Sequence, residues 1–280
     1  MKVSLVITTY NWPAALDRVL TSVENQTLLP NEVIIADDGS TQETYDLIES
    51  YKNNKNLSIK HVWQPDEGFR AAAIRNKAIL NASNEYIIFI DGDCIVRNTF
   101  IEMHQKLAKK GYFVAGNRSL LTEHFTVEIF KEKLTPGNWN YINFSKDQIN
   151  RSWNLCYFPL GGFRVINPQK WKNVKTCNLG IWKNDLNEVN GFDEIFTGWG
   201  YEDSELVIRL IRNGIKHLNG RFATTVLHLW HKENDRSHTH KNWDQLQKVL
   251  LDKKKIAVKG LKESESNLGK RQLERFDSLP

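Results

Sequence analysis

Short runs of apolar, β-favouring residues alternate with amphipathic segments over the first hundred residues of the chain. The runs 3–9, 32–36, 57–63 and 86–90 have the composition of buried strands. Apolar residues recur at helical spacing after Trp12-Pro13, and helical segments are also expected over 41–52 and 69–82. Strict alternation of strand and helix predicts an α/β fold, in which right-handed crossovers connect parallel strands and helices cover both faces of the sheet.

The pattern becomes harder to interpret in the second half. A helix over 98–110 and a strand over 112–116 continue the alternation, but 135–178 is rich in aromatic residues with weak periodicity. That segment is too aromatic for a disordered linker, so we predict a functional loop region. Beyond it we expect a helix that begins at Glu202, a short strand over 223–227 and a terminal helix over 242–258.

Each of the four early strands ends in polar residues. In an open α/β sheet, ligands bind in the crevice outside the carboxyl ends of the strands. One polar strand end is unremarkable because loops are generally polar. Four such ends on one edge indicate a binding site, with candidates Thr8, Thr9, Tyr10, Asp37, Asp38, Asp66, Asp91 and Asp93.

The pair Asp91 and Asp93 can hold a divalent metal ion. A dinucleotide-binding protein would need a glycine fingerprint directly after the first strand, and residues 8–13 contain no glycine. Phosphates must then be neutralised differently, and a metal on the two aspartates is the available means. Arg70 and Arg75 could reach the same anion, although a solvated helix face explains them equally well.

A second acidic motif follows a glycine-flanked tryptophan. Glycines around Trp199 permit close approach of a ligand, and Glu202 with Asp203 opens a helix. These two carboxylates could simply complement the helix dipole, but beside Trp199 we favour a catalytic role. His228 follows the strand expected over 223–227 and would complete a metal site, with His231 as the alternative. Nitrogen ligation shifts the expected metal toward Mn²⁺ without excluding Mg²⁺.

Composition narrows the class of partner. The chain of 280 residues is 40% hydrophobic and 25% charged, as in a globular protein, and its formal charge of +5 favours anionic partners. Basic residues are scattered among acidic loops, so nucleic acid is not expected. Three cysteines without ligand-like spacing suggest neither disulfides nor a zinc cluster. With no secretory or membrane-spanning run, we expect a cytoplasmic protein.

At its carboxyl end the chain is polar and basic, with Lys253–Lys255 inside the expected terminal helix. A solvated helix is the simpler interpretation. Peripheral contact with anionic lipid head groups, at the inner membrane surface, is the alternative.

Over residues 3–235 the sequence resembles the family 2 nucleotide-sugar glycosyltransferases of the GT-A fold. The first block of likeness comprises 3–11, Asp37-Asp38-Gly39-Ser40 and Asp91-Gly92-Asp93. The resemblance implies that the first and second strand ends bind uridine. It also implies that Asp93 is the direct metal ligand, while Asp91 contacts ribose or acts through water.

The second block, Gly198-Trp199-Gly200-Tyr201-Glu202-Asp203, is similar to a region shared by β-1,4-galactosyltransferases and bacterial chondroitin polymerase. In those enzymes the aspartate is the base on the acceptor hydroxyl, and a later histidine binds the metal. Asp203 and His228 match these roles. Retaining polypeptide N-acetylgalactosaminyltransferases have glutamate-asparagine here, so Asp203 favours inversion. The glutamine-x-x-arginine-tryptophan motif of processive synthases is absent, which favours one transfer per binding event.

The resemblance implies an inverting, metal-dependent transfer of a hexose or N-acetylhexosamine from a UDP-sugar to a glycan or glycolipid acceptor, in surface polysaccharide or lipopolysaccharide assembly. We expect a nucleotide-sugar half over 1–116, an acceptor-binding and catalytic half over 117–235 and a basic tail over 236–280. The aromatic segment 135–178 would face the acceptor. A non-catalytic nucleotide-sugar or carbohydrate-binding module with the same fold is the alternative.

Overall fold

The computed structural model describes residues 1–53, 56–132, 144–145, 147–232 and 239–265. Its first half alternates strand and helix as the sequence predicts. The elements are β1 (Val3–Thr9), α1 (Pro13–Glu24), β2 (Glu32–Asp37), α2 (Gln42–Asn53), β3 (Ile59–Trp63), α3 (Ala71–Asn81) and β4 (Tyr86–Asp91).

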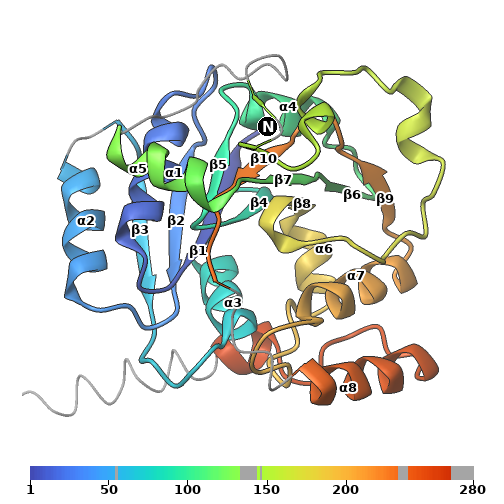
Figure 1. Ribbon diagram of the computed structural model, residues 1–280. Coiled ribbons are helices and arrows are strands. Elements are labelled where there is room, and N and C mark those ends of the chain that lie inside the picture. The colour runs from blue at the N-terminus through green and yellow to red at the C-terminus, as the bar shows by residue number, and fades with distance from the viewer. Residues whose placement is uncertain (54–55, 133–143, 146, 233–238, 266–280) are drawn as a thin grey trace, which may run out of the picture.

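These strands belong to a seven-stranded sheet in the order β3-β2-β1-β4-β8-β6-β9 (Figure 1). The four early strands are parallel to one another. β8 (Leu179–Trp182) runs antiparallel to both β4 and β6 (Tyr112–Ala115), and β9 (Lys216–Asn219) pairs parallel with β6. The predicted α/β fold with a mixed, mainly parallel sheet is thereby confirmed.

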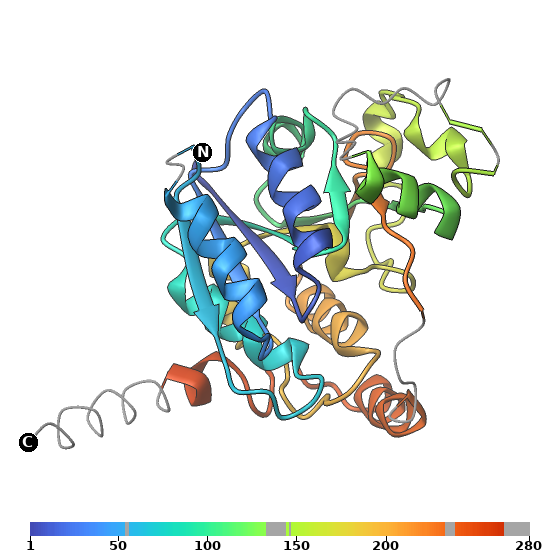
Figure 2. The ribbon, with the colours of Figure 1, turned by 60° about the vertical axis from the view of Figure 1, so that its left-hand side comes forward.

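Both faces of the sheet are buried, which explains the unbroken apolar runs in the sequence. Leu5 and Ile7 point into a core with α1 and α2, whereas Val6 points into a second core with α3 and α7 (Glu202–Arg212). The alternation follows from the two-residue period of a strand. Figure 2 shows α1 and α2 lying over one face of the early strands.

The second half adds a small sheet and several short elements. β10 (Val226–His228) pairs antiparallel with β5 (Cys94–Val96) and parallel with β7 (Arg118–Leu120). The remaining elements are α4 (Phe100–Leu107), α5 (Glu123–Lys131), α6 (Lys183–Glu188), α8 (Thr239–Leu251) and the 3₁₀ turns η2 (Ser152–Leu155), η3 (Gly161–Val165) and η4 (Thr176–Asn178). β8 and β9 belong to the same sheet as β1–β4, so the sheet itself does not mark the boundaries predicted at 116 and 235. These boundaries stay predictions.

The helix expected over 98–110 covers only Phe100–Leu107, and two further predicted elements differ from the structure in ways that hydrogen bonds explain. The strand expected over 223–227 begins only at Val226, because the backbone amides of Ala223 and Thr224 donate to the Gly220 carbonyl and close a turn. The helix expected over 242–258 covers Thr239–Leu251. Lys253–Lys255 therefore lie outside it.

The terminal helix ends early because the following chain is held against α6 and the loop after it. The backbone amide of Val258 donates to Asp193 Oδ2 at 2.9 Å, and that of Ala257 donates to the Val189 carbonyl at 3.0 Å. These contacts replace the helical hydrogen bonds that residues beyond Leu251 would otherwise make.

Candidate active site

A cavity of about 630 Å³ opens at the carboxyl ends of the parallel strands, where the sequence predicts a site. Its walls come from the ends of β1 and β4, from η4, from β7 and β10, and from the loop that leads into α7. The following predicted residues line it: Thr8, Thr9, Tyr10, Asp38, Arg75, Asp91, Asp93, Trp199, Glu202, Asp203 and His228.

Three predicted residues do not line the cavity. Asp37 is 1% exposed and lies 2.9 Å from His61 Nε2, while Asp66 accepts a hydrogen bond from the Tyr10 hydroxyl at 2.8 Å. The Arg70 guanidinium pairs with the neighbouring carboxylate of its own loop and donates to a backbone carbonyl there. None of the three lines the cavity, and Asp66 contacts it only through the lining residue Tyr10.

Arg75 connects the two acidic motifs. Its guanidinium lies 3.2 Å from Asp91 Oδ1 and 3.0 Å from Glu202 Oε1, and it donates to Thr8 Oγ1 at 3.2 Å. Burial alone would lower the pKa of Arg75, but Asp91 and Glu202 more than offset that effect and hold this pKa above its usual value. The alternative of a solvated helix face is wrong for Arg75, which is 4% exposed.

Replacing Arg75 with methionine should lower the free energy of unfolding by roughly 3–5 kcal/mol, because two buried carboxylates lose their counter-charge. Urea denaturation at pH 8 measures the effect. Arg70→Met is the matched control, since Arg70 pairs with the exposed Glu67 and should cost less than about 1 kcal/mol. Equal losses in the two variants would contradict the buried-junction interpretation.

Asp203 is a buried carboxylate at the start of α7. It is 5% exposed, its Oδ1 accepts a hydrogen bond from the Ser204 amide at 2.7 Å, and its Oδ2 lies 3.7 Å from Lys175 Nζ. Burial first, and then the neighbouring Glu202, raises the pKa of Asp203 to about 6, with Lys175 opposing the rise. A pKa near the working pH is what an effective general base requires.

The loop before α7 has an unusual backbone that glycine permits. Gly198, Gly200 and Tyr201 all adopt positive φ angles, of 73°, 107° and 73°. The Asn242 side chain on α8 donates to the carbonyls of Thr197 and Gly200, at 3.0 Å in each case. Helix α8 therefore holds in place the loop that carries Trp199 to the cavity, a role for which the sequence carries no signal.

Asp93 and two histidines form a candidate metal centre. Asp93 Oδ2 lies 3.4 Å from His228 Nε2 and 3.3 Å from His231 Nε2. Burial would raise the pKa of Asp93, but the two imidazoles reverse this and hold it below its usual value. One carboxylate with two imidazole nitrogens is a donor set that suits a transition metal such as Mn²⁺. His228 and His231, predicted as alternative metal ligands, both lie beside the Asp93 carboxylate.

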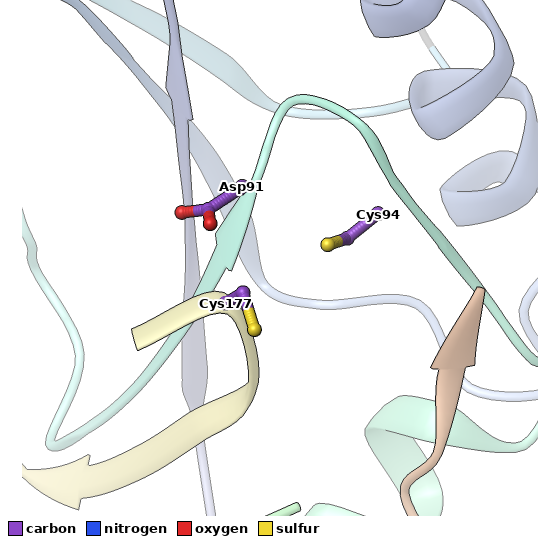
Figure 3. Close-up of side chains that lie close together, drawn as sticks. All are labelled: Asp91, Cys94 and Cys177. Atoms are coloured by element: carbon purple, nitrogen blue, oxygen red, sulfur yellow. The ribbon is translucent and has the colours of Figure 1, made fainter. Parts of the chain in front are cut away.

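Asp91, Cys94 and Cys177 lie side by side behind this centre (Figure 3). A potential ligand atom of each lies within 4.8 Å of the others. The same holds for Cys94 with Asp93 and His228. Sequence spacing does not reveal this proximity, which arises because η4 leads into β8 beside β4. Burial raises the pKa of the Cys94 thiol well above its usual value. A neutral thiol is a poor metal ligand, so we interpret the cysteines as core packing.

Three basic residues that line the cavity, Arg118, Lys175 and Lys232, were not predicted from the sequence. Arg118 lies on the three-residue strand β7 and Lys175 precedes η4, and both line the cavity. Arg118 is held above its usual pKa by Cys177, Cys94, Asp91 and Asp93, although burial opposes this. No motif marks Arg118 or Lys175, since such short elements leave no periodicity. Trp139 and Tyr141 of the predicted aromatic segment lie outside the described residues.

Comparison with known proteins gives matches to two family models. The model for glycosyl transferase family 2 matches residues 4–171, more than half of the chain. A second model, described as the N-terminal domain of galactosyltransferase, matches residues 166–232. The two matches meet at the aromatic segment and together cover every residue that lines the cavity.

Curated relatives include the validoxylamine A glucosyltransferase of Streptomyces hygroscopicus subsp. limoneus, 32% identical over 251 residues (85% of this chain and 52% of the relative). Chondroitin synthase of Pasteurella multocida is 28% identical over 75% of this chain and 23% of its own length. Cholesterol galactosyltransferase of Borreliella burgdorferi is 26% identical, over 86% and 64%. The chain spans about half the length of the first two curated relatives it matches.

Solved structures support the fold. TarS of S. aureus, in complex with UDP-GlcNAc, has a TM-score of 0.60 and 15% identity, covering 90% of this chain and 66% of TarS. The mannosyltransferase PcManGT of Pyrobaculum calidifontis, in complex with GDP-Man and Mn²⁺, has a TM-score of 0.59 and 14% identity, covering 88% and 64%. Among the described residues, no helix is long and apolar enough to span a membrane. The chain belongs to glycosyl transferase family 2.

Proposed function

We propose that this chain is an inverting, metal-dependent glycosyltransferase that moves a hexose or N-acetylhexosamine from a UDP-sugar to a hydroxyl of a glycan acceptor. The observation that carries this proposal is one cavity with two different acidic centres. Asp203, a buried carboxylate of raised pKa, and Asp93, a carboxylate beside two imidazoles, both line this cavity. Removing the acceptor proton and neutralising the departing diphosphate are separate tasks, and each needs its own centre.

Asp203 is proposed to take the proton from the acceptor hydroxyl as that oxygen attacks the anomeric carbon. Its negative form is retained at neutral pH because its pKa is raised only to about 6. Lys175, 3.7 Å from Oδ2, favours that charged form. The order glutamate then aspartate at 202–203 supports inversion through the resemblance already described.

Asp93, His228 and His231 are proposed to hold Mn²⁺ or Mg²⁺, which when bound would neutralise the diphosphate of the departing UDP. Asp91 supports this end of the cavity differently. Because its Oδ1 is committed to Arg75, we assign Asp91 to the ribose or to a water-mediated contact rather than to direct ligation.

Arg75 and Glu202 are proposed to position the site. Glu202 Oε1 pairs with Arg75, and Oε2 is buried without a hydrogen-bond partner among the described residues. An unpartnered buried acceptor costs free energy unless a ligand satisfies it. We therefore assign Glu202 Oε2 to a hydroxyl of the bound sugar, beside the base rather than as the base.

Uridine is proposed to lie against Thr8, Thr9, Tyr10 and Asp38, which line the cavity at the first two strand ends. Asp37, Asp66 and Arg70 are assigned a supporting role around that pocket, because hydrogen bonds and ion pairs already occupy them. Trp199 also lines the cavity and is proposed to stack on the donor or acceptor sugar.

A glycan or glycolipid is proposed as acceptor, in surface polysaccharide or lipopolysaccharide assembly at the cytoplasmic side of the membrane. The names of the relatives support a saccharide acceptor only as a class. Residues 1–116 are proposed as the nucleotide-sugar half, 117–235 as the acceptor and catalytic half, and 236–280 as a basic tail.

Incubation with a panel of UDP-sugars and Mn²⁺ tests the proposal. We expect slow release of UDP from at least one donor even without acceptor, since water can replace the hydroxyl, and loss of that release in EDTA. GDP-mannose is the control donor and should release little. Tight UDP binding without release from any donor would instead indicate a non-catalytic binding module.

A further inference from the structure

An exposed apolar surface lies on residues 153–166, between α5 and β8, and none of these residues lines the cavity. Large side chains that would normally be buried are half or more exposed here. They are Trp153 (50%), Tyr157 (58%), Phe158 (58%), Phe163 (71%) and Ile166 (71%). Several large apolar side chains left exposed on one short segment of a globular protein favour an interaction site.

The exposure is built into the structure. Arg164 is 7% exposed, and its guanidinium donates to the carbonyls of Asn219 and Arg221 at 2.6 and 3.1 Å. The carbonyl of Asn154 accepts from Thr225 Oγ1 at 2.8 Å. These contacts fasten the segment to the turn between β9 and β10. The apolar side chains point outward although its backbone is tied down.

Charge distinguishes this surface from the rest of the chain. Residues 151–175, which we call the interfacial segment, contain Arg151, Arg164, Lys170, Lys172 and Lys175 and no acidic residue. Arg151, Lys170 and Lys172 are exposed. The Arg221 guanidinium lies 4.4 Å from the centre of the Trp153 ring and adds another cation at its edge.

We propose that the interfacial segment docks on an anionic lipid bilayer. Aromatic and aliphatic side chains bordered by lysine and arginine are the composition of surfaces that lie in the membrane interface, where apolar groups enter the acyl boundary and cations contact head groups. Exposed amides are present at Asn167, Gln169 and Asn173, but the segment has no carboxylate to bind sugar hydroxyls, and its exposed cations fit an anionic surface better than a neutral glycan. A self-interface is disfavoured by like charges facing one another.

The segment is well placed for this role. Its last residue, Lys175, lines the cavity, as do the next two residues, Thr176 and Cys177. In Figures 1 and 2 it lies at the upper right of the molecule, whereas α8 lies at the bottom. Membrane contact through this segment would bring the cavity near lipid-linked acceptors. It would leave Lys253–Lys255, after α8, away from the bilayer.

Flotation of the full chain with vesicles tests the proposal. We expect the wild type to float with phosphatidylglycerol–phosphatidylcholine vesicles and much less with phosphatidylcholine alone. Phe163→Ser with Ile166→Ser should weaken binding at least about tenfold, because two apolar anchors are lost. Leu251→Ser with Ile256→Ser is the matched control, since both side chains are exposed but lie beyond the segment, and it should float like the wild type.

Lys170→Gln with Lys172→Gln should weaken binding to the anionic vesicles about fivefold per cation, and added salt should reduce the difference. Unchanged flotation of the Phe163–Ile166 variant would overturn the proposal, as would no flotation of the wild type. If light scattering showed that the wild type is a dimer and that this variant is a monomer, the surface would be a self-interface instead. UDP release without acceptor needs no membrane, so its retention in the variant separates this proposal from the proposed function.

Discussion

Replacing Asp203 with asparagine should slow sugar transfer by about 10²–10⁴-fold while leaving UDP binding nearly unchanged. The amide keeps the shape of the carboxylate but cannot accept the proton of the acceptor hydroxyl. The nucleotide is assigned to Asp93 and the first two strand ends rather than to Asp203, so UDP binding should be unaffected. Single-turnover transfer measures the first effect, and calorimetric titration with UDP and Mn²⁺ measures the second. Undiminished transfer would remove Asp203 from the role of base.

The pH dependence of the same pair of proteins sharpens this prediction. Because the base must be ionised, wild-type transfer should rise with pH through about 6 and then level off. The residual rate of Asp203→Asn should lack that rise. A wild-type profile that falls across this range would contradict a base at this position.

Stability should change in the opposite direction to activity. The pKa of Asp203 is raised in the folded protein from the usual 3.8 to about 6, so the folded state binds this proton more tightly than the unfolded state. The contribution of this group is fully present below pH 3.8 and is lost as pH rises through 6. Asp203→Asn should therefore melt at a higher temperature than the wild type at pH 8, with the difference shrinking toward pH 4.

The Asp93→Ala variant should lose metal-dependent UDP binding altogether. Asp93 is the carboxylate shared by His228 and His231, so its removal leaves the candidate metal centre with nitrogen donors alone. Calorimetric titration with UDP, in Mn²⁺ and in EDTA, measures the loss. Asp46→Ala, an exposed carboxylate on α2, is the control and should bind UDP like the wild type. If Asp93→Ala bound UDP in Mn²⁺ as tightly as the wild type does, Asp93 would have no role in binding the metal.

The strands that both helical layers cover could be predicted from sequence. β1, β2 and β4 are nearly continuous apolar runs because each face of the sheet packs on a helix, and their polar ends therefore stand out. The convergence of those ends on one cavity follows from parallel pairing. Asp91 and Asp93 could be placed at this edge from the sequence on this basis, whereas Asp203 is assigned to the site from the glycine-flanked Trp199 and the family resemblance.

What could not be predicted depends on pairing between distant segments. β5 and β7 are three residues long, too short to show a period, yet β7 brings Arg118 to the cavity. β8 inserts antiparallel beside β4 and thereby brings Cys177 to Cys94. Sequence spacing carries no record of either contact. Early termination of α8 likewise depends on Asp193, far away in the chain, which binds the backbone after Leu251.

Without the family resemblance, roles within the acidic pair could be distinguished only with geometry. Asp91 and Asp93 are equivalent carboxylates in the sequence, two residues apart on one strand end. In the structure Arg75 pairs with Asp91, while His228 and His231 lie beside Asp93. A difference of partners, rather than of residue type, is what separates the proposed metal end from the proposed ribose end.

Release of UDP from a UDP-sugar panel in Mn²⁺, followed side by side for the wild type and Asp203→Asn, tests the central proposal most directly. We predict that the wild type releases UDP from at least one donor, that EDTA stops the release, and that the variant is slower by about 10²–10⁴-fold. Equal release by the two proteins, or none from any donor by the wild type, would contradict the proposal of a base-catalysed glycosyl transfer at this site.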